Sequence, residues 1–343
     1  MNDGATAPMR DAGVLVTGAT GFLGSSLVRR LLGAGTRVRV LVRSQAKARA
    51  MAAQGAEPVV GEITDPAAVS AAVDGVAVVH HLAGRLLVPG VPASEYRRTH
   101  VDGTRVLLEC CRAAPNLERL VHCSTTGVLG VTGPRPADES APLRPTNVYE
   151  QTKAEAETAV REAAQAGLPV VIVRPGLVYG PGDLHLLGFF RAVLRRRFRP
   201  IGREPVWLHP IYLDDMTEAL VRCGEDPAAL GECFHIAGAQ PESLQGLAAA
   251  IARAAGGRPA PGHIPMVAAR AAAAVGDALP SPLRASAPLT RSRLDFLTHS
   301  RVYDVAKAQS VLGFTAATDL PTGTARTTAW YRGEGHLPAG AGA

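Results

Sequence analysis

The chain has 343 residues, 47% of them hydrophobic and 19% charged, which is typical of a folded globular protein and excludes a disordered one. Its net charge of +6 suits an anionic cofactor or substrate, but neither the arginines nor the few aromatic residues form a nucleic-acid-binding pattern. Five cysteines without metal-ligand spacing and an N-terminus without a signal-peptide apolar stretch predict a cytoplasmic protein with reduced thiols and no metal site.

A glycine-rich turn follows the first predicted strand, Val14 to Val16. Apolar residues at helical spacing come next, so the order is strand, glycine turn and helix, as in a dinucleotide-binding fingerprint. In that reading Gly18 permits the tight turn, Gly21 lets the backbone approach a pyrophosphate, and Gly24 allows close packing of the helix on the strand. The alternative is a turn that only packs a helix, and the position at the start of the chain favours cofactor binding.

The second predicted strand, Val38 to Val42, bears on the choice of cofactor. An NAD site usually has an acidic residue at the end of this strand to hold the ribose 2′-hydroxyl, and neither Val42 nor Arg43 is acidic. A guanidinium group can instead pair with a 2′-phosphate. The sequence therefore favours NADP(H), with NAD(H) as the alternative if Arg43 is an ordinary surface residue.

Strands and helices continue to alternate along the chain. Further strands are predicted at residues 58–60, 76–80, 120–123 and 170–173, with another at 233–236. Asp65-Pro66 is a typical helix start, and residues 98–112 and 186–197 have helical patterns. This order predicts a doubly wound parallel α/β sheet, followed by a smaller and mostly helical C-terminal region.

The most informative helix is predicted from Asn147 to Ala166, with Asn147 as its N-cap and Glu150 reaching back. Tyr149 and Lys153 are four residues apart, so both side chains lie on one face of this helix. An ammonium group beside a phenol is expected to lower the pKa of the tyrosine. A tyrosine with such a pKa can exchange a proton with a carbonyl or alcohol oxygen, whereas the alternative is a solvated pair on a surface helix.

With these residues in view, the chain resembles the extended short-chain dehydrogenase/reductase family, and in particular its branch of hydroxysteroid dehydrogenases and dihydroflavonol-reductase-like enzymes. The resemblance extends from Val14 to Trp330. Seven motifs occur in the order of the family, at residues 17–24, 81–84, 101–104, 124–125, 149–153, 174–182 and 209–215. One departure is His100, where the family commonly has an asparagine.

The resemblance implies a Rossmann domain and a catalytic set of Thr125, Tyr149 and Lys153, with Ser124 as the substitute for Thr125. In that set the tyrosine exchanges the proton, the lysine holds the nicotinamide ribose, and the threonine hydrogen-bonds the carbonyl oxygen. The expected cofactor contacts are Gly18, Thr20, Gly21, Phe22, Leu23, Gly24, Arg43, Glu62, Ile63, Leu82, Ala83, Gly84, Tyr149, Lys153, Pro175 and Val178.

Three functions fit this resemblance. An NADP(H)-dependent oxidoreductase acting on a ketone or aldehyde and the matching alcohol is favoured, because Leu177 stands where sugar-nucleotide enzymes commonly have an asparagine. A nucleotide-sugar epimerase with tightly bound cofactor is the alternative, and a non-catalytic NADP-sensing protein is a third. Arg85, Leu177, His185 and Phe189 are the candidate substrate contacts for an apolar small molecule.

The predicted division of the chain places the cofactor domain at residues 12–175, with residues 210–237 returning to it. Residues 176–209 and 238–332 would form the substrate-binding region, and residues 1–11 and 333–343 would be disordered tails. The resemblance further implies a homodimer that joins residues 98–112 and 147–166, where Ala154, Ala156, Ala159, Ala163 and Ala164 would permit close approach. The basic run at residues 191–199 is interpreted as a solvated helix end rather than a phosphate- or membrane-binding site, and no membrane-spanning segment is predicted.

Overall fold

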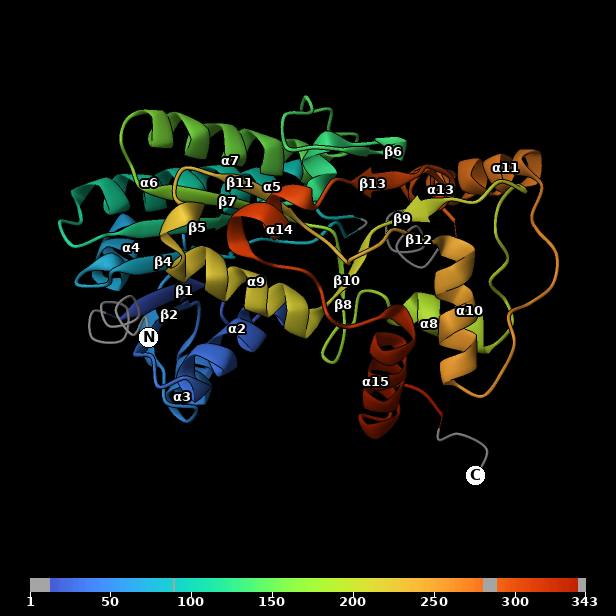
Figure 1. Cartoon of the computed structure of the whole chain (residues 1–343), viewed down its shortest axis with the longest axis horizontal. Coiled ribbons are helices and arrows are strands. Elements are labelled where there is room, and N and C mark those ends of the chain that lie inside the picture. The colour runs from blue at the N-terminus through green and yellow to red at the C-terminus, as the bar shows by residue number, and fades with distance from the viewer. Residues whose placement is uncertain (1–12, 89, 280–288, 339–343) are drawn as a thin grey trace.

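A computed structural model describes residues 13–88, 90–279 and 289–338 of the chain (Figure 1). Its centre is a seven-stranded sheet in the order β11-β7-β5-β4-β1-β2-β3, and every pair of neighbouring strands is parallel. The strands are β1 (Val14–Thr17), β2 (Val38–Val42), β3 (Glu57–Val60), β4 (Val78–His81), β5 (Arg119–Cys123), β7 (Val170–Pro175) and β11 (Cys233–Ile236). The predicted doubly wound α/β fold is confirmed.

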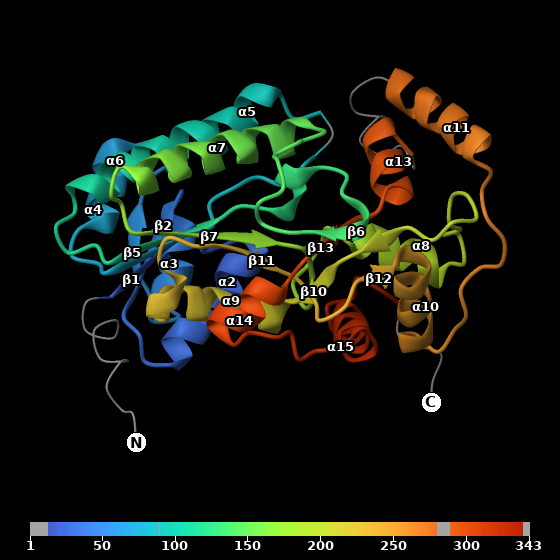
Figure 2. The same cartoon turned by 45° about the horizontal axis from the view of Figure 1, so that its top comes forward.

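Helices cover both faces of this sheet (Figures 1 and 2). On one face the core includes side chains from α2 (Phe22–Gly33), α3 (Gln45–Ala52), α9 (Leu213–Glu225) and α14 (Ala306–Leu312). On the other it includes side chains from α4 (Pro66–Val73), α6 (Gly103–Ala113) and α7 (Val148–Gln165). Helix α5 (Ala93–Arg97) runs into α6 through a π-helical turn at Arg98–Asp102. The predicted helix over residues 98–112 thus begins earlier and contains this turn.

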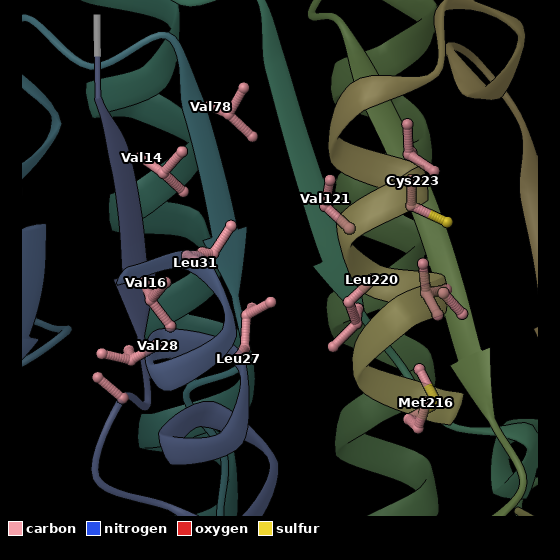
Figure 3. Close-up of a cluster of buried hydrophobic side chains, with 14 of the residues drawn as sticks. Val14, Val16, Leu27, Val28, Leu31, Val78, Val121, Met216, Leu220 and Cys223 are labelled. Carbon is pink, nitrogen blue, oxygen red and sulfur yellow. The ribbon is translucent and has the colours of Figure 1, made fainter. Parts of the chain in front are cut away.

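The alternation of side chains along β1 shows how the two faces are filled. Val14 and Val16 point towards the α2 and α9 side, where Leu27 and Leu220 meet them in the same cluster (Figure 3). Leu15, between them, belongs to the cluster on the opposite face. Both faces of the sheet are therefore dry, as expected of a parallel sheet that is covered by crossover helices.

The second part of the structure lies beyond the carboxyl ends of the strands and has no large sheet (Figure 1). Its short strands form three pairs, β8 with β10, β9 with β12 and β6 with β13. The strands are β6 (Gly133–Ala137), β8 (Leu177–Tyr179), β9 (Trp207–Leu208), β10 (Pro210–Tyr212), β12 (Glu242–Ser243) and β13 (Arg301–Tyr303). The helices are α8 (Leu187–Leu194), α10 (Leu244–Ala254), α11 (Met266–Ala278), α13 (Arg291–Thr298) and α15 (Leu320–Gly333).

The structure departs from the predicted division of the chain in several places. The strands β6 and β10 fall within the predicted cofactor segments 12–175 and 210–237 but pair outside the central sheet. Residues 306–314 were assigned to the substrate-binding region, but Ala308, Leu312 and Phe314 pack in the core cluster under the central sheet. Order also continues past residue 333, because Leu337 is only 4% exposed in a cluster with Tyr331, and Arg191 donates hydrogen bonds to the His336 carbonyl oxygen. The other predicted tail residues, 1–11 and 339–343, lie outside the described residues.

In the described part of the chain, no helix has both the length and the apolar character needed to cross a bilayer.

Candidate active site

Glycines hold the turn between β1 and α2 close to the neighbouring strand. Gly18 has a φ of +71°, which favours glycine, and a Cβ atom there would lie 2.6 Å from the Leu82 carbonyl group after β4. A Cβ atom on Gly24 would lie 2.2 Å from the Gly18 oxygen, so a larger residue would push α2 away from the turn. Gly21 is the N-cap of α2 and gives the first N–H groups no side-chain acceptor. The backbone there is suited to an anionic group such as a pyrophosphate.

A cleft of about 250 Å³ lies against this turn. Its walls come from the turn, from α2, from the loop after β8 and from α15, and they are Thr20, Gly21, Phe22, Ser25, Arg29, Pro181, Gly182 and Trp330. Arg29 is exposed on α2, and the helix has no acidic residue in its first turn. The cleft therefore fits the phosphates of a dinucleotide cofactor in shape and charge.

Arg29 and Trp330 were missed in the sequence. The position of Arg29 on α2 could have indicated it, because Ser25 and Arg29 follow Gly21 at spacings of four, on one side of the helix. No local signal points to Trp330, since α15 reaches the cleft only through the tertiary fold.

The ends of β2 and β3 lie side by side, as their parallel pairing requires. Arg43 is exposed directly after β2, and Ser44 behind it caps α3 by accepting a hydrogen bond from the Lys47 N–H. After β3, the Glu62 carboxylate pairs with Arg98, while Ile63 packs against Gly103 at the start of α6. A positive group at the end of β2 is therefore open to solvent, and no carboxylate ion pair of Arg43 occurs among the described residues.

Helix α7 begins as its sequence predicts. Asn147 is the N-cap and its Oδ1 accepts a hydrogen bond from the Glu150 N–H at 3.0 Å. The Glu150 carboxylate reaches back one residue further than expected and accepts hydrogen bonds of 2.7 Å from the N–H and hydroxyl of Thr146. These bonds fix the first turn of α7, which carries Tyr149.

Tyr149, Lys153 and Thr125 come together at the carboxyl end of β5. The Lys153 Nζ donates a 2.6 Å hydrogen bond to the carbonyl oxygen of Cys123, the last residue of β5. Thr125 is two residues further on, and its side chain hydrogen-bonds to Tyr149. The Thr125 Oγ1 accepts the Gly127 N–H at 3.1 Å, which leaves its own proton for a donated bond. Two hydroxyl groups and one ammonium group therefore share one corner of the sheet.

The expected effect of Lys153 on Tyr149 is not found in this structure. Burial raises the pKa of Tyr149 to about 12, although the hydrogen bond from Thr125 opposes the rise. The Lys153 ammonium group bonds to the β5 backbone instead, and burial lowers its own pKa. The prediction from helical spacing was therefore wrong for the protein without ligands, because the four-residue spacing does not fix where the long lysine side chain bonds. Here Tyr149 keeps its proton at neutral pH.

Ser124 is not part of this group. Its hydroxyl donates a 2.7 Å hydrogen bond to Glu157, which lies one helical turn beyond Lys153. Glu157 is fully buried and accepts two hydrogen bonds from Arg174, at 2.6 and 3.0 Å. Burial alone would raise the pKa of Glu157, but the hydrogen bonds and charge of Arg174 outweigh it and leave the pKa below its ordinary value. This ion pair ties α7 to β7 directly behind the site.

Glu157 was missed in the sequence, although a signal was present. It follows Tyr149 and Lys153 at the same spacing of four and therefore continues their face of α7.

His100, which stands where the family commonly has an asparagine, hydrogen-bonds through both of its ring nitrogens. It lies in the π-helical turn before α6, a kind of irregularity that is frequent at functional sites. Its Nε2 accepts the Arg85 N–H at 3.0 Å, and its Nδ1 is 2.8 Å from the Thr152 hydroxyl. Its ring also meets the Tyr149 ring edge-on, with centroids 5.6 Å apart. His100 thus links the loop after β4 to the first turns of α7.

Three buried histidines lie around Lys153, and all three are neutral at physiological pH. Burial, and secondly the charge of Lys153, lower the pKa of His81 and of His100 to about 3, and the pKa of His122 falls well below its usual value for the same reasons. Because these histidines are neutral, the positive charge among them resides on Lys153.

Within the described part of the chain, no group of three or more His, Cys, Asp or Glu side chains could hold a metal ion.

The four candidate substrate contacts are not equivalent in the structure. Leu177 and Phe189 are partly buried and pack against both apolar clusters of the second part of the structure, called the substrate half below. The Arg85 side chain faces Glu95, at 3.8 Å, and its N–H is held by His100. His185 is exposed, and its N–H donates to Asp183. Of the four candidates, Leu177 and Phe189 therefore have apolar surroundings, and these two residues are called the apolar wall below.

The alanines expected at a dimer interface are largely used within the subunit. Ala154, Ala156 and Ala163 are buried in the single chain, and only Ala159 and Ala164 retain partial exposure. The homodimer stays a prediction, without the support that these small residues were expected to give.

Comparisons with known proteins agree with the dinucleotide-binding fold described above. The family model described as "NAD dependent epimerase/dehydratase family" matches residues 14–237. A 4-hydroxy-2-methyl-3-oxo-4-farnesyl-3,4-dihydroquinoline-1-oxide ketoreductase from Stigmatella aurantiaca is 31% identical over 330 residues, which cover 94% of this chain and 98% of that protein. A 2-alkyl-3-oxoalkanoate reductase from Shewanella oneidensis is 28% identical over 334 residues, covering 92% of this chain and 85% of that protein.

Among solved structures, one described as MoeE5 in complex with UDP-glucose and NAD is similar with a TM-score of 0.74 and 27% identity. The match covers 94% of this chain and 99% of that chain. Reductases and sugar-nucleotide enzymes are thus both among the similar proteins.

Proposed function

Because the chain belongs to the NAD-dependent epimerase/dehydratase family, it is an NAD(P)-dependent oxidoreductase of the extended short-chain dehydrogenase/reductase type, and we propose that it interconverts a ketone or aldehyde and an alcohol on a mostly apolar small molecule. NADP(H) is the preferred cofactor in this proposal. The observation that carries it is the meeting of Thr125, Tyr149 and Lys153 at the end of β5, beside the glycine turn.

A nicotinamide cofactor, when bound, would supply or accept the hydride. The glycine turn and the N-terminus of α2 would hold its phosphates, and Arg29 would add a positive charge there. The residues present fit such a group, because the turn brings bare backbone up to the cleft.

In the direction of reduction, the Tyr149 hydroxyl donates its proton to the substrate oxygen. With a pKa of about 12 the group holds its proton at neutral pH, as a donor must, but it is a weak acid there, so the transfer depends on stabilisation of the phenolate that forms. Thr125, whose proton is directed at Tyr149 in this structure, would turn that proton to the same oxygen when substrate binds, with its own oxygen held by the Gly127 N–H. Lys153 is held on the Cys123 carbonyl oxygen in this structure, and it would have to turn from β5 towards the phenol to stabilise the phenolate that forms.

His100 acts as a positioning residue in this mechanism. Its neutral ring accepts the Arg85 N–H and so carries a proton on Nδ1, which it donates to Thr152. The Thr152 hydroxyl in turn donates to the Val148 carbonyl oxygen in the first turn of α7. The chain of bonds therefore holds Tyr149 at a fixed distance from the loop after β4.

The apolar character of the substrate is supported by Leu177 and Phe189, which are partly buried and pack against both apolar clusters of the second part of the structure. Two similar proteins are named as reductases of a farnesyl-substituted dihydroquinoline oxide and of 2-alkyl-3-oxoalkanoates. Both names describe ketones that carry apolar groups, which is the class we propose here.

A nucleotide-sugar epimerase is the second candidate, because a similar structure is described with UDP-glucose and NAD. The same Tyr and Lys residues could serve it. Leu177 disfavours it, since an apolar side chain cannot hydrogen-bond a sugar nucleotide.

One experiment separates the two. Purified protein is incubated with NADPH or NADH and a series of 2-alkyl-3-ketoesters of increasing chain length, and in parallel with UDP-glucose under calorimetry. We expect consumption of NADPH with ketones and no heat of binding with UDP-glucose. Micromolar binding of UDP-glucose, together with no ketone reduction, would replace the proposal with the epimerase.

A further inference from the structure

The solvent face of helix α11 is apolar except for Arg270, which is exposed beside Val267 and Ala274. Its inner face is formed by Ala269, Ala273 and Gly276, which are buried. The outer face carries Val267, Ala271, Ala274, Val275 and Ala278, at the spacing of one helical stripe, and all five are exposed. Val267 is 80% exposed and Val275 is 65% exposed. A helix that turns its valines outwards is a candidate for contact with another surface.

The helix lies at the outer edge of the molecule, far from the central sheet. Figure 2 shows it at the upper right, above α13 and beyond α8 and α10. No other element of the described chain covers its outer stripe, as the exposure of those five residues shows.

A strongly basic segment is bound to the start of α11. Residues 195–203 carry five arginines and no carboxylate, and Arg195, Arg196, Arg197, Arg199 and Arg203 are all exposed. This segment pairs with the residues that lead into α11, through bonds from the Ile264 N–H to the Pro200 oxygen at 2.8 Å and from Arg199 to the Pro261 oxygen at 3.1 Å. In the described chain none of the five forms an ion pair with a carboxylate.

Helix α13 connects this surface to the proposed substrate wall. It packs against α11, and its Phe296 and Leu297 reach the apolar cluster that also contains Leu177 and Phe189. The apolar side chains of α13 thus join α11 to the cluster that contains the candidate substrate contacts.

From these observations we propose that α11 docks on the surface of an anionic lipid bilayer, with residues 195–203 against the headgroups. An apolar stripe beside a cluster of guanidinium groups that no carboxylate neutralises has the two properties that hold a helix in the membrane interface. The basic run alone favours a solvated helix end, and the exposed valines of α11 change that interpretation. The proposal rests on the proposed function in one respect, because the bilayer would be the source of the apolar ketone.

The test uses the full chain and flotation with large unilamellar vesicles, either of phosphatidylcholine alone or with about a third of phosphatidylglycerol. We expect binding to the anionic vesicles that falls as salt is raised, and little binding to the neutral ones. The double variant Val267→Asp, Val275→Asp should bind about tenfold or more weakly, because two charges replace the apolar contact. Arg195→Gln with Arg197→Gln should weaken binding to anionic vesicles and leave binding to neutral vesicles unchanged.

The matched control is Leu230→Asp, since Leu230 is 46% exposed on the loop before β11 and remote from α11. It should bind vesicles as the parent protein does. Equal loss in the control and the α11 variant, or no vesicle binding by the parent protein, would overturn the proposal. A parent dimer that the α11 variant converts to a monomer would also overturn it, because the stripe would then be covered by a second copy.

Turnover distinguishes this proposal from the proposed function. The α11 variant should reduce a short, water-soluble ketone at the parent rate and a vesicle-delivered, long-chain ketone several-fold more slowly. If no ketone is reduced while the α11 variant still loses vesicle binding, the proposed function fails and the docking surface stands.

Discussion

The cofactor half, which contains the central sheet, and the substrate half hold their side chains in place by different interactions. In the cofactor half, polar side chains behind the site are buried and held by fixed partners, as in the Glu157–Arg174 pair and the bonds of His100. In the substrate half, the candidate substrate contacts Leu177 and Phe189 are apolar, partly exposed and held mainly by packing, as for Phe189 against Phe198. The first half therefore holds its side chains by directional bonds, and the second holds them by apolar packing.

This contrast predicts where substitutions act. Changes among the fixed polar groups should affect turnover or stability, because directional bonds are lost. Changes in the apolar wall should affect mainly the KM, because contacts there are made equally with the bound substrate and the transition state.

The largest effect is expected for Tyr149→Phe. Loss of the proton donor should reduce kcat by about 10²- to 10⁴-fold, while the packing of the ring is retained. The Kd for NADPH, measured by fluorescence titration, should stay within a factor of a few, because the hydroxyl faces Thr125 and not the glycine turn. A variant that keeps parent-like turnover of a ketone would show that Tyr149 is not the proton donor.

The next effect is on stability, through Glu157→Gln. Arg174 would lose the charge that compensates its own, in a position that is only 1% exposed. Removing one partner of a buried ion pair costs about 3–5 kcal/mol in the free energy of unfolding, which urea titration would measure. The matched control is Glu155→Gln on the same helix, whose exposed pair with Arg97 should contribute about 1 kcal/mol or less. Equal losses in the two variants would contradict the assigned role of burial.

The contrast between the halves also explains which parts of the fold could be predicted from the sequence. The glycine turn, the strands of the sheet and the α7 cap were predicted correctly, since glycine spacing, β-branched runs and capping residues act over a few neighbouring residues. The substrate half was predicted poorly. Its two- and three-residue strands, such as β9 and β12, are stabilised by pairing with segments far away in the chain and have no local pattern.

Within the site, the same limit applies. Helical spacing placed Tyr149 and Lys153 on one face, but it could not indicate that Lys153 bonds to the Cys123 oxygen or that burial raises the pKa of Tyr149. Both depend on how closely β5 approaches α7, which is a property of the tertiary structure.

A moderate effect is expected for Arg43→Ala, which tests the choice of cofactor. A 2′-phosphate carries roughly two negative charges, and charge-assisted hydrogen bonds contribute about 1.5–3 kcal/mol each, so one good contact gives a preference of about ten- to hundredfold for NADPH. The variant should lose that preference and keep its affinity for NADH, both measured by titration. Arg49→Ala, an exposed arginine on α3, is the control and should change neither affinity. Equal affinities of the parent protein for the two cofactors would show that Arg43 faces solvent.

The smallest effect is expected in the substrate half, for Leu177→Ala. Leu177 lies between two apolar clusters, so the truncation removes contact area that a bound apolar ketone would share. The loss of a few methyl or methylene contacts corresponds to about 1–3 kcal/mol, and the shared packing of the clusters should keep the effect near the lower end. We therefore expect the KM for a long-chain ketone to rise about tenfold, with kcat nearly unchanged. Leu230→Ala, which removes an exposed leucine remote from the site, should leave both constants as they are. A fall in kcat as large as that of Tyr149→Phe would mean that Leu177 positions the reacting atoms, and the division of roles between the two halves would then be wrong.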